Sequence, residues 1–295
     1  ESLAADDGRW ADDPGMAAVF LPAGRALREG ETLRQPALAA TLRTVAAEGA
    51  GAFYRSHIGE RFCTGFRERG GLLEPADLAA HETEVTAPLR LDALEHQFVT
   101  TPPNSQGSVL LGLLAALHRT GDWIDPLGAE AGTLARLFAH AVEDRRLRLG
   151  DPRTGAVAAR PDGDTVAVVA ADDEGYAVAV IESLFDAFGS GVLEPGTGII
   201  AHDRGAGFSL EPGSVNRLRP RARPAHSLMP LLVLRDGRPR AVAGTMGGWA
   251  QPQIHTQILS RVLGREEPVE GAVAAPRWTV DVRSEEHTSE LQSPN

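Results

Sequence analysis

The feature that most constrains the fold is an apolar β-run that begins at a single threonine, Thr165. The run covers residues 165–171, and the turn-rich residues 160–164 precede it. The simplest interpretation is that this β-branched residue begins a strand. A chemical interpretation is also open. If the chain were cut between Asp164 and Thr165, one residue would carry a hydroxyl nucleophile and an α-amine base that titrates near about 7.7–8.0.

The rest of the second half is predicted to form hairpins and then a helix. The Asp236-Gly237 pair is the strongest short hairpin signal in the chain, because both residues tolerate a positive φ. A second turn is predicted at residues 172–175. The strands flanking the turn at 172–175 are expected at 166–171 and 177–181, and those flanking Asp236-Gly237 at 231–234 and 240–243. A helix is expected at 253–263.

The first half is predicted to be mainly helical, with two strands near its middle. Apolar residues recur at helical spacing, and paired glycines end the helices. The expected helices cover 35–48, 52–69, 109–117 and 129–149, and the expected strands cover 85–91 and 97–100. This order favours antiparallel sheets layered with helices over a doubly wound parallel sheet.

Composition excludes several classes of function. The chain has 295 residues and a net charge of −11, with no basic stripe of the kind that binds nucleic acid. The single cysteine, Cys63, excludes an intramolecular disulfide and a cysteine-based zinc site, and we expect it to be buried in a helix. No apolar run approaches the length of about 18 residues that spans a membrane. No His, Asp and Glu cluster has ligand spacing, so neither a metal nor an organic cofactor is expected.

Both ends of the chain are predicted to be incomplete. The first residue is Glu1 rather than Met, so we expect the true N-terminus to be missing, and the compartment (periplasmic, secreted or cytoplasmic) stays open. Residues 283–295 break with the preceding composition and are similar to the conceptual translation of a sequencing adapter. We therefore interpret them as a non-native tail and exclude them from the fold. A genuine polar tail is the alternative.

Several motifs, in this order along the chain, together resemble the γ-glutamyltranspeptidase family of N-terminal nucleophile hydrolases. No single motif is specific, but the combination is, and it spans nearly everything from Leu33 to Trp278. The segments that carry the resemblance are 53–55, 101–107, 144–145, 149–152, 163–166, 188–198, 216–218, 223–230, 244–248, 251–253 and 275–278.

The resemblance implies an α+β fold, a four-layer αββα sandwich, in a chain that cuts itself before the threonine. Residues 1–164 would then be the C-terminal part of the large-subunit region, and residues 165–282 the N-terminal part of the small-subunit region. The two fragments would remain together as a heterodimer. Because the family's chains are longer, we expect the sandwich to be incomplete here.

The family's catalytic roles transfer to five residues. Thr165 would attack the carbonyl of Asp164 and later a substrate amide. Gly247 and Gly248 would supply backbone N–H groups to the oxyanion, although a simple turn before a helix is the alternative. Ser183 would hydrogen-bond the nucleophile, and its alternative is an ordinary serine at a strand end.

The substrate pocket is predicted less completely. His226 and Ser227 match a pocket-lining loop, and Arg204 would face an acidic substrate group. The alternatives are a structural histidine and a solvated arginine. Two departures weaken γ-glutamyl specificity. Gly207 stands where the family has an acidic residue that binds the substrate amine, and Phe185 stands where it has a polar residue.

These observations favour a Thr-nucleophile amidohydrolase or acylase that acts on a small amide through an acyl-enzyme. A genuine γ-glutamyltransferase or glutathione hydrolase is the alternative within the family. The alternative that is not an enzyme is a truncated, non-catalytic remnant of such a protein.

Overall fold

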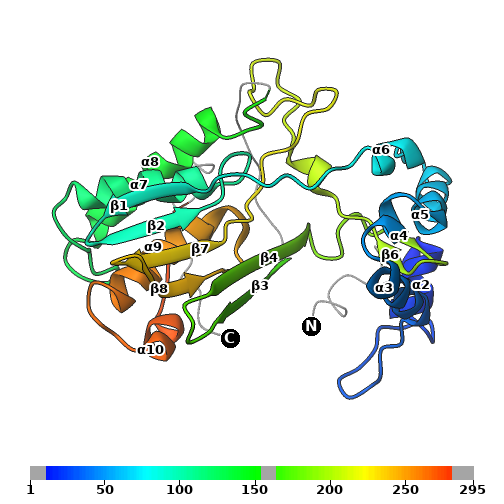
Figure 1. The fold of residues 1–295 in the computed structure, drawn as a ribbon, viewed down its shortest axis with the longest axis horizontal. Helices are drawn as coiled ribbons and strands as arrows, with labels where there is room; N and C mark the ends of the chain where they lie inside the picture. Colours follow the sequence, from blue (N-terminus) through cyan, green and yellow to red (C-terminus); the bar gives the residue numbers. More distant parts are fainter. Residues whose placement is uncertain (1–10, 154–163, 281–295) are drawn as a thin grey trace. The chain divides into compact units, whose positions relative to one another are not determined.

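The computed structural model describes residues 11–153 and 164–280, and these fall into two compact units (Figure 1). Unit 1 comprises Glu1–Val85 and Asp186–Asp203, and unit 2 comprises Thr86–Phe185 and Arg204–Asn295. The predicted turn at 160–163 and the predicted tail at 283–295 lie outside the described residues.

Unit 1 is a group of short helices with one small strand pair. Asp13 organises one end of it, because its carboxylate caps the first helix by accepting from the Met16 N–H at 2.8 Å and pairs with Arg69 at 2.6 Å. Met16, Phe20 and Leu193 form the small core beside this cap. The elements are α2 (Pro14–Phe20), α3 (Pro36–Glu48), α4 (Gly51–Tyr54), α5 (His57–Arg67), α6 (Pro75–Ala79), β5 (Leu193–Glu194) and β6 (Ile199–Ile200).

The predicted single helix at 52–69 is wrong, because the chain breaks it into α4 and α5. Ser56 adopts an extended conformation between them and caps α5, with its hydroxyl oxygen accepting from the Ile58 N–H at 3.4 Å. Serine is a preferred N-cap residue, so this local bond competes with a continuous helix. Cys63 lies in α5 and is fully buried, as predicted.

Unit 2 contains a four-stranded antiparallel sheet in the order β1-β2-β7-β8. The strands are β1 (Leu89–Ala93), β2 (His96–Thr100), β7 (Leu231–Arg235) and β8 (Arg238–Ala243). The predicted Asp236-Gly237 turn is confirmed, since both residues have positive φ values of 52° and 74°. The strand predicted at 85–91 begins only at Leu89.

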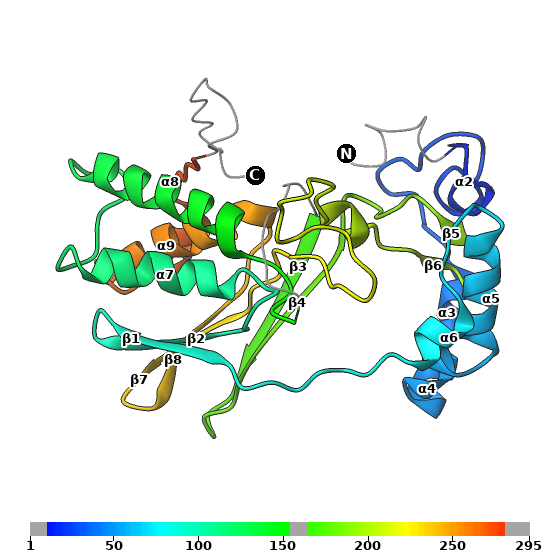
Figure 2. The same cartoon turned by 90° about the horizontal axis from the view of Figure 1, so that it is seen from above.

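Three helices cover one face of this sheet (Figure 2). They are α7 (Gly107–His118), α8 (Ala131–Arg148) and α9 (Gln251–Val262), and the short α10 (Val269–Ala274) follows. Helix α7 is apolar on nearly all sides because it packs against both the sheet and its neighbouring helices. The core beneath the helices includes Phe98, Leu110, Leu114, Leu117, Leu134, Phe138, Leu231, Val233 and Leu259.

A separate hairpin of β3 (Asp164–Ala171) and β4 (Ala177–Phe185) packs against the end of β8. The contact is close at Gly244, where an added Cβ atom would lie 2.7 Å from the Cβ atom of Ala167. Unit 2 is therefore a mixed α+β structure of helices on antiparallel strands, as predicted. The complete four-layer sandwich stays a prediction.

Candidate active site

Thr165 lies at an irregularity in the hairpin. Asp164 pairs with Phe185 and Val166 pairs with Glu182, so the single residue Thr165 faces two residues of β4, Ser183 and Leu184. This two-against-one pairing is a β-bulge, which redirects the side chains around it. Thr165 is 8% exposed although it is the second residue of its strand. The bulge therefore directs the predicted nucleophile inward and sets Ser183 opposite it.

The glycine pair follows β8 at a sharp turn. Gly247 and Gly248 have positive φ values of 112° and 51°, a conformation that glycine adopts more readily than other residues. In the described part of the chain, neither N–H donates to another protein group. Gly244, three residues before this turn, touches Ala167, which shares a face of β3 with Thr165. The hairpin therefore contacts the segment that leads to the glycine turn.

Ser183 and Arg204 lie together at the end of β4. A guanidinium nitrogen of Arg204 donates to the carbonyl oxygen of Ser183 at 3.3 Å, and the guanidinium lies 5.2 Å from the centre of the Phe185 ring. The Ser183 hydroxyl accepts from the Phe185 N–H at 3.0 Å. A Cβ atom at Gly207 would lie 3.9 Å from the tip of the Phe185 ring. The two positions that depart from the family pattern are therefore close enough that a side chain at residue 207 would reach the Phe185 ring.

His226 and Ser227 lie on a loop that runs beside residues 104–106. The main-chain N–H of His226 donates to the carbonyl of Asn104 at 3.0 Å, and the carbonyl of His226 accepts from Gln106. Burial of the ring, together with the positive charges of Arg204 and Arg223, lowers the pKa of His226 to about 3. His226 is consequently neutral at physiological pH, next to the arginine predicted to face substrate.

Gln106 joins this loop to the glycine turn. Its side chain is fully buried, and its amide nitrogen donates to the carbonyl oxygens of Ser227 and Gly248, both at 2.9 Å. In the sequence, Gln106 stands out only as a member of the segment 101–107, which resembles the family. A glutamine before an apolar helix gives no signal of such a contact.

Asp151 is a buried carboxylate within the segment 149–152, which was singled out only because it resembles the family. It is 1% exposed and pairs with Arg153 at 2.6 Å and Arg223 at 3.5 Å. Burial opposes its ionisation, but the hydrogen bonds from Arg153 and Arg223 outweigh burial and hold its pKa well below the usual range. Asp151 thereby fixes the guanidinium of Arg223 near His226.

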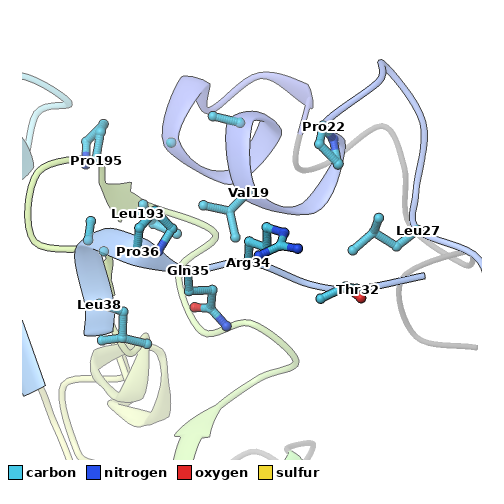
Figure 3. Close-up of a pocket in the computed structure, with 14 residues that line it drawn as sticks. Val19, Pro22, Leu27, Thr32, Arg34, Gln35, Pro36, Leu38, Leu193 and Pro195 are labelled. Carbon is cyan, nitrogen blue, oxygen red and sulfur yellow. The ribbon is translucent and has the colours of Figure 1, made fainter. Parts of the chain in front are cut away.

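All the predicted site residues belong to unit 2. The side chain of Asp164 is outside the described set. Unit 1 has a groove of about 400 Å³, lined by residues such as Val19, Leu38 and Leu193 (Figure 3). None of the predicted site residues lines it.

Within residues 11–153 and 164–280, no three His, Cys, Asp or Glu side chains are grouped so that they could hold a metal ion. Over the same ranges, no helix has the length and apolar character needed to cross a membrane.

Comparison with known proteins identifies the family. A family model described as Gamma-glutamyltranspeptidase matches residues 1–160 and 153–294. The chain belongs to the gamma-glutamyltranspeptidase family. This finding confirms the resemblance inferred from the motifs. Membership sets the context for Thr165 and the glycine pair, while their individual roles stay predictions.

Members of the gamma-glutamyltranspeptidase family with different described activities are similar to this chain. The oxamate amidohydrolase proenzyme of Klebsiella pneumoniae is 34% identical over 293 residues, which covers 90% of this chain and 55% of that protein. The glutathione hydrolase-like YwrD proenzyme of Bacillus subtilis is 33% identical, and the match covers 91% of this chain and 56% of that protein. The cephalosporin acylase from Bacillus halodurans, known from its crystal structure, is 29% identical in sequence and superposes with a TM-score of 0.81. The match covers 90% of this chain and 54% of that chain.

The chain thus spans about half the length of these relatives. Its α+β structure shares the fold of the matched part of the cephalosporin acylase.

Proposed function

We propose that this protein is a Thr-nucleophile amidohydrolase that cuts its own chain between Asp164 and Thr165 and then hydrolyses a small amide. The observation that carries the proposal is the position of Thr165. It is buried at a β-bulge, faces Ser183, and shares a strand face with Ala167, which touches the segment leading to the glycine turn. Family membership and the proenzyme names of its relatives support the same chemistry.

In the first reaction, the hydroxyl oxygen of Thr165 attacks the carbonyl carbon of Asp164. The C–N bond breaks, the threonine nitrogen takes a proton, and an ester joins Asp164 to the threonine oxygen. Water then hydrolyses this ester. The products are a free carboxylate on Asp164 and a free α-amine on Thr165.

In the second reaction, the new α-amine accepts the hydroxyl proton as Thr165 attacks the substrate carbonyl. The N–H groups of Gly247 and Gly248 stabilise the oxyanion, and each such donor typically contributes about 10²–10³ in rate. The C–N bond of the substrate breaks, and its amine leaves with a proton. Water, or an acceptor amine, then releases the acyl group from the threonine.

The two proposed fragments, with the cut before Thr165, would stay associated as a heterodimer. Strand β2 precedes the cut and pairs with β7 after it, with Phe98 opposite Val233. Both side chains are fully buried in one core. The sheet therefore joins the large-subunit and small-subunit segments without a covalent bond between them.

The acyl group of the substrate is proposed to lack the amine of a γ-glutamyl group. Gly207 offers no carboxylate to bind such an amine, and its Cα faces the Phe185 ring. An unpaired buried ammonium would lose about 1–3 kcal/mol or more of binding energy. Relatives named for oxamate and for acylase activity are compatible with this preference, and Arg204 is the proposed contact for an acidic acyl group.

The decisive experiment replaces Thr165 in the full-length protein. We expect Thr165→Ala to leave one unbroken chain by intact-mass measurement and to lower amide turnover at least about 10³-fold, because nucleophile and base are lost together. The matched variant, Thr165→Ser, keeps a hydroxyl and should still cut itself. Self-cleavage and turnover by Thr165→Ala at the wild-type rate would exclude the proposed mechanism.

The substrate class is tested separately with three anilides that release the same aniline. Their acyl groups are γ-glutamyl, a simple acyl group, and the monoacyl group of a dicarboxylic acid. We expect the γ-glutamyl anilide to be the poorest by kcat/KM, by about tenfold or more, given the missing carboxylate. If the γ-glutamyl anilide is instead the best, the protein is a glutathione hydrolase or γ-glutamyltransferase, the competing assignment that relatives such as the Bacillus subtilis protein support.

A further inference from the structure

A single side chain, Gln106, binds two segments that the proposed function requires to act together. Its Nε2 atom donates to the carbonyl oxygen of Gly248 in the glycine turn and to that of Ser227 in the pocket loop, both at 2.9 Å. Its main-chain N–H donates to the carbonyl of His226 at 3.1 Å. We propose that Gln106 is a positioning residue that aligns the oxyanion donors with the substrate loop, an inference that rests on the proposed function.

The orientation of the Gln106 amide follows from its surroundings. Both neighbouring groups are carbonyl oxygens, so a flipped amide would set oxygen against oxygen at 2.9 Å. The Oε1 atom is buried and has no hydrogen-bond partner among the described residues. An apolar side chain would avoid that unsatisfied atom, so packing alone does not account for a glutamine. The amide is explained by its two donated hydrogen bonds.

The bond to Gly248 adds a side-chain restraint to a turn whose two glycine carbonyls also accept hydrogen bonds from the main chain of the helical turn that follows. Gly247 and Gly248 both have positive φ values, and glycine imposes little restriction on such a turn. Holding the Gly248 carbonyl fixes the plane of the peptide bond that follows the turn. Arg145 holds the next carbonyl, that of Trp249, at 2.9 Å. The N–H of Gly248 lies in the preceding peptide plane, which is joined to this one at the Gly248 Cα atom. The two bonds therefore limit the rotation that would turn this N–H away from a developing negative charge.

The bond to Ser227 links this alignment to the substrate loop. A shift of Gln106 would displace the glycine turn and the loop that carries His226 and Ser227 together. An error of about 1 Å in such a site can lower the rate about 10²-fold even when binding is preserved. Loss of Gln106 should therefore slow the chemical step more than it weakens substrate binding.

The chain contains a matched control, Gln257. This residue is also fully buried, and its amide nitrogen also donates to two main-chain carbonyls, those of Gln253 at 3.2 Å and Trp278 at 2.7 Å. It anchors the segment after α10 to α9 and contacts none of the proposed site residues. Gln106→Met and Gln257→Met remove the same group from equally buried positions, and Gln257→Met also removes the acceptor of the Trp278 N–H at 3.2 Å.

The experiment compares these two variants and the wild type in the full-length protein, using single-turnover acylation by an acyl anilide. We expect both variants to lower Tm, with Gln257→Met lowering it at least as much as Gln106→Met. Only Gln106→Met should lower the acylation rate, by about 10–100-fold, with a change in KM below about threefold. The same variant should narrow the rate difference between an amide and the matching thioamide, because sulfur fits aligned oxyanion donors poorly.

An acylation rate in Gln106→Met equal to that in Gln257→Met would overturn the inference. So would a loss confined to KM, or an unchanged amide-to-thioamide ratio. These outcomes are distinct from failure of the proposed function, which is scored in the same assay by Thr165→Ala. If Thr165→Ala acylates normally, the proposed function and this inference both fail. If Thr165→Ala is inactive and Gln106→Met is normal, only this inference fails.

Discussion

At the scale of residues, burial decides the charge of two histidines in unit 2. His255 is 2% exposed in α9, and burial lowers its pKa to about 4. The pKa of His226 is lowered to about 3 by burial and by Arg204 and Arg223. Both are therefore neutral in the folded protein near pH 5, whereas the unfolded chain binds protons at these residues below about pH 6.5.

The sign of the pH dependence follows from this difference. Because the unfolded state binds more protons between about pH 4 and 6.5, acidification in that range favours unfolding. We expect His255 alone to remove about 2 kcal/mol of unfolding free energy between pH 7 and pH 5. The variant His255→Leu cannot bind that proton, so it should lose correspondingly less stability over this range. Urea unfolding at the two pH values measures the difference.

The control is His140→Leu at an exposed position of α8, which should keep the wild-type pH dependence. An equal loss of stability on acidification in His255→Leu and in the wild type would show that His255 is protonated in the folded state.

At the scale of elements, the approach of the β3–β4 hairpin to β8 depends on Gly244. An added Cβ atom would lie 2.7 Å from the Cβ atom of Ala167 and closer still to the Ile181 side chain. The end of Ile181 can rotate away, but the Ala167 Cβ atom moves only with its strand. Because that strand also carries Thr165, a shift there would move the proposed nucleophile.

We expect Gly244→Ala to destabilise the protein by about 1–3 kcal/mol, the usual consequence of overpacking. It should also slow self-cleavage about tenfold, because Thr165 would lose its alignment. Urea unfolding and a time course of intact mass measure the two effects. The control is Gly112→Ala, at an exposed helical position with open space around it, which should stabilise by about 0.5–1 kcal/mol. Wild-type stability and cleavage in Gly244→Ala would show that the hairpin does not pack this closely.

At the scale of the whole molecule, unit 2 carries an apolar face that nothing in the described residues covers. Val166, Val168, Val178 and Val180 project from one side of the hairpin and are between 48% and 61% exposed. Contiguous apolar surface of this kind marks a place where other protein surface packs. The net charge of −11 disfavours association between copies of the chain, and so opposes the packing of one apolar face against another.

Two divisions of the chain coexist at this scale. The predicted cut before Thr165 divides the sequence into large-subunit and small-subunit regions, and this division stays a proposal. The compact units divide the chain elsewhere, at 85/86, 185/186 and 203/204. Each proposed fragment would therefore contribute to both compact units.

The sequence by itself determined the family, the hairpin at Asp236-Gly237, and the strand that carries Thr165, whose predicted start is one residue later than the observed start at Asp164. These features are local, because a turn, a strand start or a motif depends on residues adjacent in the chain. It also indicated both departures from the family pattern, Gly207 and Phe185, without showing that the two positions are close together.

Only the tertiary structure decided which distant residues meet. The contact of Gln106 with Gly248, the burial of Asp151 between two arginines and the pairing of β2 with β7 each join segments far apart in sequence. Such contacts arise from packing and from hydrogen bonds that buried polar groups must make. The periodicity of one segment carries no information about the partner that another segment will supply.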